Sequence, residues 1–261
     1  MRIAVAWAAP LPGAIDANLA SAARLAGSAA AAGAGLLVLP QAFLTGPAED
    51  DVTVAERALL SDGPALLALA AIARRRRIAI LCGYLEACSG RHHDAALFVD
   101  DRGCALANYR RTHFHLGADP YVLARGQWLT VVPFGRRRLG LLIGADIEAP
   151  EPARALILAG ADLLLALGSH GGGSAVIGDA LLPARAFENG CALAYANACT
   201  GAGAPRSRIL GPNGRLLAEA GECLTVADAA PPVDGSRRTE RRPQLYQKLA
   251  ATPPEESGLR R

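Results

Sequence analysis

The residues that could carry chemistry gather first around the stretch from Leu139 to Glu151, Leu-Gly-Leu-Leu-Ile-Gly-Ala-Asp-Ile-Glu-Ala-Pro-Glu. It begins as an apolar strand, breaks at Gly144-Ala145, and continues after Pro150 as a segment rich in alanine and leucine, for which we expect a helix. Many α/β enzymes mount a nucleophile on such a strand-to-helix turn. Here the tip of the turn carries a glycine, which has no side chain to react.

Several polar groups elsewhere could supply acids, bases or ligands. Arg111, His113 and His115 share the polar stretch from 109 to 115, and these histidines could line a pocket or lie in an exposed loop. Ser169 and His170 are neighbours at the end of a strand, so we expect their side chains to diverge rather than form a nucleophile–base pair. Neither the cysteines nor the segment His92-His93-Asp94 shows metal-ligand spacing, so we expect no metal site. We expect Asp146, Glu148 and Glu151 to cap the helix that starts near Pro152.

The elements that must position these residues alternate along the chain. Many of the expected strands are apolar throughout and need cover on both faces, which predicts two packed sheets with helices outside, in one domain over 1–261. A tail rich in proline and arginine, 231–261, is expected to wrap outward, with another subunit as one place for it to lie. The expected strands are 2–7, 36–40, 78–84, 94–99, 105–109, 128–134, 139–143, 161–167 and 191–197, with a hairpin over 208–225, and the expected helices are 18–32, 64–77, 152–159 and 178–189.

Composition limits the classes of protein to which the chain can belong. It has 261 residues, of which 51% are apolar and 20% charged, as in a globular domain. A net charge of +3 and an aromatic content of 5% argue against a nucleic-acid partner. Lys248 is the sole lysine, so an arginine where a lysine is expected can reflect a general bias. With no signal peptide and no uninterrupted apolar run long enough for a membrane span, we expect a cytoplasmic protein with reduced cysteines and no membrane partner.

Taken together, five motifs resemble those of the carbon–nitrogen hydrolase family, the nitrilase/amidase superfamily. The resemblance covers nearly the whole chain and implies an α/β fold, a four-layer α-β-β-α sandwich, usually paired across a two-fold axis into a dimer. It also implies a cysteine nucleophile, a glutamate base and a lysine that stabilises the tetrahedral intermediate, with no cofactor. The motifs are Leu37 to Phe43 with Thr45-Gly46, Tyr109 to His113, Leu142 to Glu151, Arg185 to Asn189, and Arg241 to Tyr246.

Position by position, this chain departs from the family's catalytic groups. The glutamate position is Gln41, an amide that is not a practical base. The lysine position is Arg111, which keeps the charge, and the cysteine position is Gly144. A second glutamate that assists in many members would fall at or near Asp119, which is shorter by one methylene.

These departures lead to two hypotheses. In the first, the chain is a pseudoenzyme that keeps the fold and a neutral-to-basic pocket, where Gln41, Arg111 and His113 bind a small amide or carboxylate. It would then act as a binding, regulatory or structural protein, as a homo-oligomer or with an active relative. In the second, the chain hydrolyses a carbon–nitrogen bond without a cysteine, using Arg111 as oxyanion partner and Asp119 or Glu148 as base.

Overall fold

Two six-stranded sheets pack face to face in the computed structural model, which describes residues 1–48, 50–115, 119–199, 201–233 and 241–246. The first sheet has the strand order β12-β1-β2-β3-β4-β5, and the second has the order β11-β10-β9-β8-β7-β6. Their inner faces form one apolar core, in which side chains such as Val5, Leu81 and Phe98 of the first sheet belong with Leu141 and Leu165 of the second.

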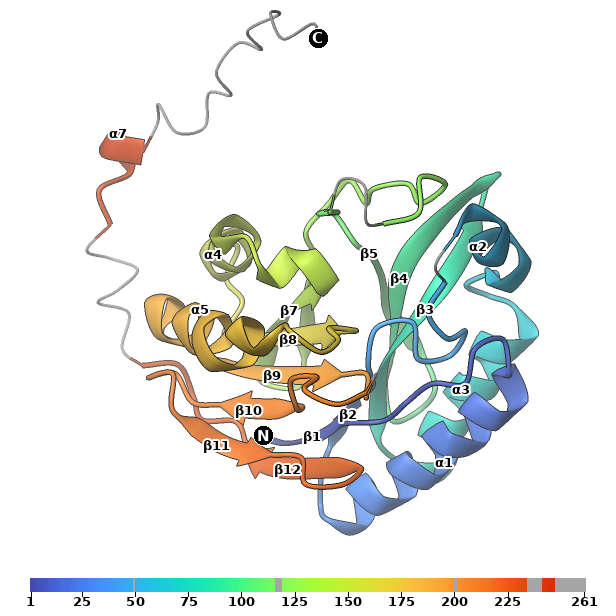
Figure 1. Ribbon diagram of the computed structural model, residues 1–261. Coiled ribbons are helices and arrows are strands. Elements are labelled where there is room, and N and C mark those ends of the chain that lie inside the picture. Colours follow the sequence, from blue (N-terminus) through green and yellow to red (C-terminus); the bar gives the residue numbers. More distant parts are fainter. Residues whose placement is uncertain (49, 116–118, 200, 234–240, 247–261) are drawn as a thin grey trace, which may run out of the picture.

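Helices cover both outer faces of the sandwich (Figure 1). Helices α1 (Ile15–Ala31) and α3 (Pro64–Arg76) pack on the first sheet, and α4 (Pro150–Leu158) and α5 (Leu182–Asn189) pack on the second. Helix α5 is preceded by a π-helical turn, η2 (Ile177–Leu181). The predicted four-layer α-β-β-α sandwich is confirmed.

The strands that matter for the site run parallel in the middle of each sheet. In the first sheet β1, β2 and β3 are parallel, and in the second β7, β8 and β9 are parallel. Their carboxyl ends meet, since the backbone N–H of Gln41, after β2, donates to the carbonyl of Gly168 at the end of β8. The bounds of the first sheet are β1 Arg2–Ala6, β2 Leu36–Val38, β3 Ala79–Cys88, β4 Arg91–Val99, β5 Ala105–Arg110 and β12 Leu224–Asp228. Those of the second are β6 Val131–Phe134, β7 Arg137–Ile143, β8 Leu163–Gly168, β9 Ala192–Asn197, β10 Arg208–Leu210 and β11 Leu216–Glu219.

Three features differ from the sequence prediction. Strands β3 and β4 are longer than predicted and form a hairpin of their own, in which Cys88 pairs with Arg91. A helix, α2 (Asp51–Arg57), was not predicted; it is capped by Asp50, whose carboxylate accepts from the backbone N–H of Thr53. The predicted hairpin over 208–225 is confirmed for β10 and β11, which pair antiparallel, but its end is wrong, because the residues from Leu224 onward form β12 and pair antiparallel with β1 in the other sheet.

The structure bears only in part on two further predictions, the absence of a membrane span and the course of the C-terminal tail. No helix among the described residues is both long and apolar enough to cross a bilayer. Of the predicted tail, the residues 234–240 and 247–261 lie outside the described residues, and a short helix, α7 (Pro243–Tyr246), is described between them.

Candidate functional site

The turn after β7 brings Gly144 into the centre of a polar cluster. Gly144 has a φ of +51°, in the left-handed region that favours glycine, and it opens a short 3₁₀ helix, η1 (Gly144–Ile147). A Cβ atom at this position would lie 3.0 Å from Oε1 of Gln41 and 3.3 Å from Cζ of Arg111. The three positions at which the family would have its cysteine, glutamate and lysine are therefore adjacent in space.

Gln41 is bonded to a carboxylate that the sequence analysis did not place in the site. Its Nε2 donates to Oδ2 of Asp94, 2.6 Å away, while its Oε1 faces Gly144. Asp94 is buried on β4, and its Oδ1 has no hydrogen-bond partner among the described residues. Burial raises the pKa of the Asp94 carboxyl, although the charge of Arg111 and the Gln41 hydrogen bond act in the opposite direction.

Arg111 is buried, and most of its hydrogen-bonding capacity is used within the protein. Its Nη1 donates to Oδ2 of Asp94 at 3.2 Å and to Oδ1 of Asp119 at 2.9 Å, and its Nη2 donates to Oδ2 of Asp119 at 2.7 Å. Its Nε donates to the carbonyl of His113 at 2.7 Å. Burial opposes its charged form, but the two carboxylates raise the pKa of Arg111 above its usual value. Of the five N–H groups of a guanidinium, at most one is left for a ligand.

Asp146 fixes the turn against the polar stretch after β5. Its carboxylate accepts from the backbone N–H groups of Ile143, Thr112 and His113 and from the hydroxyl of Tyr109 at 2.6 Å. Burial raises the pKa of Asp146, but the hydrogen bonds with the side chain of His113, the hydroxyls of Tyr109 and Thr112 and the backbone of Ile143 outweigh it and leave the pKa below its usual value. The predicted side-chain cap of α4 is wrong, because its N-cap is Ala149, which makes no side-chain cap bond, whereas Glu151 lies in the first turn of α4, where the helix dipole favours a carboxylate.

Glu148 lies between two histidines at the edge of the same cluster. Its Oε2 is 2.9 Å from Nε2 of His115 and its Oε1 is 3.3 Å from Nε2 of His170. The hydrogen bond with His170, together with that of His115, lowers the pKa of Glu148 to about 2. His170 is itself held by the hydroxyl of Tyr195, 2.6 Å from Nδ1. Glu148 is therefore an ionised partner of two imidazoles and a weak base.

Several of these groups line a pocket with a volume of about 210 Å³, although Asp146 and Glu148 are not among its lining residues. The four predicted positions Gln41, Arg111, Gly144 and Asp119 all line it. His113 does not, since its ring is bonded to Asp146, and His115 lines the pocket instead. None of the cysteines lines the pocket. The described residues of the lining are Gln41, Ala42, Pro47, Ala48, Leu85, Asp94, Arg111, His115, Asp119, Pro120, Leu123, Gly144, Ala145, Ser169 and His170.

The described lining contains more acidic groups than the sequence analysis placed in the pocket. Among the described residues of the lining, Arg111 is the only lysine or arginine, and it is paired with two carboxylates, Asp94 and Asp119. A ligand carboxylate would meet no unpaired arginine or lysine here. The sequence alone did not reveal that Asp94 faces Arg111.

Neighbouring side chains of the segment His92-His93-Asp94, on β4, point to opposite faces of the sheet. Side chains alternate between the faces of a strand, so Asp94 lines this pocket while His93 lies on the opposite face of β4 and lines another cavity. The described residues hold no cluster of three histidine, cysteine, aspartate or glutamate side chains that could bind a metal ion.

Comparisons with known proteins all indicate the same family. The profile of the carbon–nitrogen hydrolase family matches residues 2–233. A Pseudomonas protegens protein described as a hydrolase in the pqqF 5′ region is 36% identical over 96% of this chain and 92% of its own length. An (R)-stereoselective amidase from a Pseudomonas species is 32% identical over 71% of this chain and 69% of its own length.

Solved structures agree with this result. The NitN amidase of Nesterenkonia sp. AN1 has a TM-score of 0.86 and 31% identity, over 95% of this chain and 99% of that one. A double mutant of the same amidase, in which glutamine replaces a glutamate and alanine replaces a cysteine, was solved in complex with acrylamide, with a TM-score of 0.85 and 31% identity over 95% of this chain and 97% of that one.

Proposed function

Because this chain belongs to the carbon–nitrogen hydrolase family, within the nitrilase superfamily, we propose that it is a member that has lost cysteine-dependent hydrolysis and binds a small neutral amide. The observation that carries the proposal is Gly144 at the centre of the pocket, 3.0 Å from Gln41 Oε1 when measured from a Cβ built on it. Covalent catalysis needs a nucleophile, and deletion of one costs roughly a millionfold in rate.

The hydrogen-bonding groups of the pocket favour an amide over a carboxylate. Oε1 of Gln41 accepts no hydrogen bond from the described residues and faces the space above Gly144, so it can accept from an amide N–H. Arg111 has at most one N–H for the ligand's carbonyl oxygen, which suffices for an amide. A carboxylate would lie near Asp119 without an unpaired arginine or lysine.

The Nesterenkonia double mutant gives independent support. In that relative, glutamine and alanine stand where a glutamate and the cysteine were removed, and the protein was solved with acrylamide. The family resemblance puts Gln41 and Gly144 of our chain at the glutamate and cysteine positions, and a relative that lacks both a glutamate and a cysteine was solved in complex with a small amide.

The alternative, hydrolysis with Asp119 as base and Arg111 as oxyanion partner, has less support. Both carboxylate oxygens of Asp119 accept hydrogen bonds from Arg111, and Oδ2 accepts a further one from the backbone N–H of His115 at 2.6 Å. Both carboxylate oxygens of Asp119 are therefore already engaged within the protein.

Binding and turnover can be measured on the same sample. We expect calorimetry to detect acrylamide and propionamide, propionate to bind at least about tenfold more weakly, and no ammonia to be released. Ala48→Leu, at the pocket lining, should weaken amide binding, whereas Ala155→Leu, on the exposed side of α4, should not. Ammonia release at rates near the enzyme median, about 10 per second, would overturn the loss of hydrolysis. If Ala48→Leu and Ala155→Leu bind the amides equally well, the amide does not bind in this pocket.

The assembly is part of the same proposal. The family resemblance implies pairing across a two-fold axis, and we propose a homodimer or a complex with an active relative. Light scattering of the purified chain distinguishes a dimer from a monomer, and a monomer that stays monomeric in the presence of an active relative would contradict both.

A further inference from the structure

A second, larger cavity lies on the opposite face of the strands that carry the first pocket. It has a volume of about 670 Å³, within the range of ligand sites in proteins. Residues adjacent in sequence point into different cavities: Glu86, His93 and Arg110 face this one, while Leu85, Asp94 and Arg111 face the pocket around Gly144. The lining is Ser61, Glu86, Cys88, Ser89, Arg91, His93, Asn108, Arg110, Arg125, Gly126, Gln127, Trp128 and Thr130.

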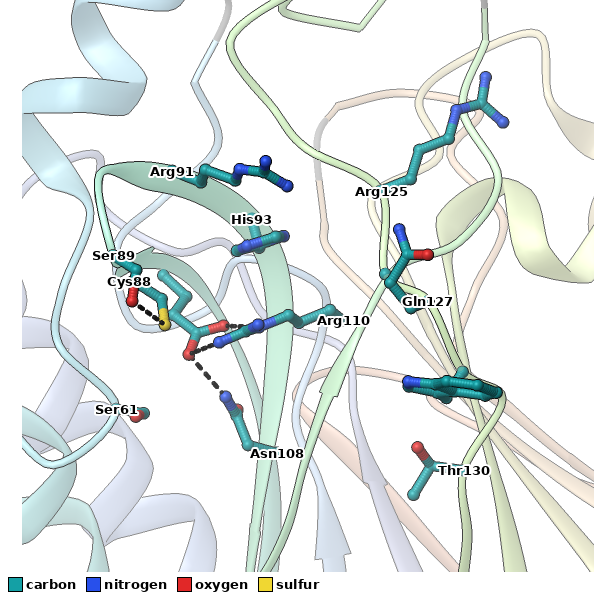
Figure 2. Close-up of a pocket in the computed structure, with 13 residues that line it drawn as sticks. Ser61, Cys88, Ser89, Arg91, His93, Asn108, Arg110, Arg125, Gln127 and Thr130 are labelled. Carbon is teal, nitrogen blue, oxygen red and sulfur yellow. Dashed lines mark hydrogen bonds and ion pairs between the residues drawn. The ribbon is translucent and has the colours of Figure 1, made fainter.

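The floor of this cavity is a fixed polar cluster. Glu86 is fully buried on β3 and accepts from Nε and Nη2 of Arg110, at 2.6 and 2.9 Å, and from Nδ2 of Asn108 at 2.8 Å. Figure 2 shows Arg110 and Asn108 near each other, and both donate hydrogen bonds to the carboxylate of Glu86. The bidentate bond holds the guanidinium of Arg110 in one orientation and leaves up to three of its N–H groups for a ligand.

The rim adds two arginines without acidic partners. Neither Arg91 nor Arg125 forms an ion pair with any carboxylate of the described residues, and both are exposed. Arg91 and His93 lie two residues apart on β4, and both line the cavity (Figure 2). With three arginines and one glutamate, the lining carries a net charge of +2 when His93 is neutral. This charge is unbalanced inside a concave site, where it attracts anions strongly.

Two further groups give the site shape and selectivity. Trp128 lines the cavity and is 82% exposed, so its aromatic ring is open to contact with a ligand. His93 is buried, and its Nδ1 lies 2.8 Å from the carbonyl of Ala124, so Nδ1 carries the proton and Nε2 of the neutral ring is an acceptor. Burial lowers the pKa of His93, which favours this neutral form.

We propose that this cavity binds an organic dianion that carries an aromatic ring. The dianionic group, a phosphate monoester or two carboxylates, matches the +2 charge and is held by Arg91, Arg110 and Arg125. The ring stacks on Trp128, and a hydroxyl or amino group donates to His93. A nucleoside monophosphate and an aromatic dicarboxylate both have this chemistry, and the volume admits either.

Calorimetry with adenosine monophosphate, phthalate and adenosine tests the proposal and separates the two sources of the dianion. We expect at least one of the two dianions to bind, with an affinity that falls as the salt concentration increases. If adenosine monophosphate binds, adenosine should bind at least about tenfold more weakly, because it lacks the phosphate. Arg91→Ala/Arg125→Ala should reduce affinity at least about tenfold. The control Arg75→Ala/Arg136→Ala removes the same charge from exposed positions outside the cavity and should leave affinity unchanged.

Trp128 provides a second measurement. Binding should change its fluorescence on a Trp7→Phe background, which leaves Trp128 as the chain's one tryptophan. Trp128→Ala should weaken binding several-fold and leave the protein's mass in solution unchanged. The proposal is overturned if neither dianion binds at low salt, if the arginine pair and its control behave alike, or if Trp128→Ala converts a dimer into a monomer. The last result would make this face a contact between copies of the chain.

Discussion

Nε2 of Gln41 lies 2.6 Å from Oδ2 of Asp94, and this contact determines what a restored catalytic site would need. An amide can donate to a carboxylate at this distance. A glutamate in its place would put two carboxylates together in a buried site, where one of them takes up a proton and is no longer a base. Gln41 and Asp94 therefore form a matched pair.

The first prediction follows from this pair. Restoring the family's three groups with Gln41→Glu, Arg111→Lys and Gly144→Cys should give little amidase activity, because Asp94 remains beside the new carboxylate. Adding Asp94→Asn should raise ammonia release from propionamide by at least about a hundredfold over the triple variant. Circular dichroism and thermal unfolding check that both variants are folded. Equal activity of the triple and quadruple variants would show that Asp94 does not control the base.

The second prediction concerns Arg111, whose guanidinium is buried between Asp94 and Asp119. Arg111→Met leaves both carboxylates without a cation, and we expect the free energy of unfolding in urea to fall by about 3–5 kcal/mol. Adding Asp94→Asn and Asp119→Asn removes the unpaired charges and should recover a large part of that loss. Additive destabilisation by the three substitutions would mean that the charges do not interact.

The third prediction concerns Asp146, which ties the turn at Gly144 to the segment after β5. Asp146→Asn replaces one acceptor oxygen by a donor and should lower the free energy of unfolding by about 2–3 kcal/mol at pH 7. Because the folded protein lowers the pKa of Asp146, the stabilisation is present above the usual value of 3.8 and is lost as the pH falls below it. Asp101→Asn, at an exposed turn, should change stability little.

The positions of Gln41, Arg111 and Gly144 could be predicted from the sequence because each belongs to a local motif with its own strand ending. Gln41 follows an apolar strand closed by Pro40, and Gly144 marks a strand-to-helix break. The family order then assigned them to one site, and the structure brings them together.

Asp94 could not be predicted in the same way, because its role depends on strand register. It lies within β4, where the pairing of Ala95 with Arg110 brings it beside Arg111. No local pattern fixes that pairing. His170 and Glu148 were missed as partners for a similar reason, since they follow different strands and meet only where β7 and β8 end side by side. β12 was misplaced because a short apolar strand does not indicate which sheet it joins.

The last prediction uses the two histidines that border Glu148. Hydrogen bonds with His170 and His115 lower its pKa from 4.5 to about 2. A carboxyl with a lowered pKa stabilises the fold above its unfolded value and loses that effect as the pH falls through its folded value. Glu148→Gln should therefore be less stable than the wild type at pH 7, by at most about 1 kcal/mol because the side chain is partly exposed to solvent.

The difference between wild type and Glu148→Gln should shrink between pH 4.5 and 2, the range over which the carboxylate titrates. Urea unfolding at several pH values in this range measures it, and taking the difference cancels the titration of the other carboxylates. Glu151→Gln, in the first turn of α4, is a matched exposed control. Its stability should differ little from that of the wild type, and the difference should not change between pH 4.5 and 2. If the Glu148 difference stays constant from pH 7 to pH 2, the carboxylate is not held ionised by the two histidines, and its contribution is that of an uncharged hydrogen-bonding group.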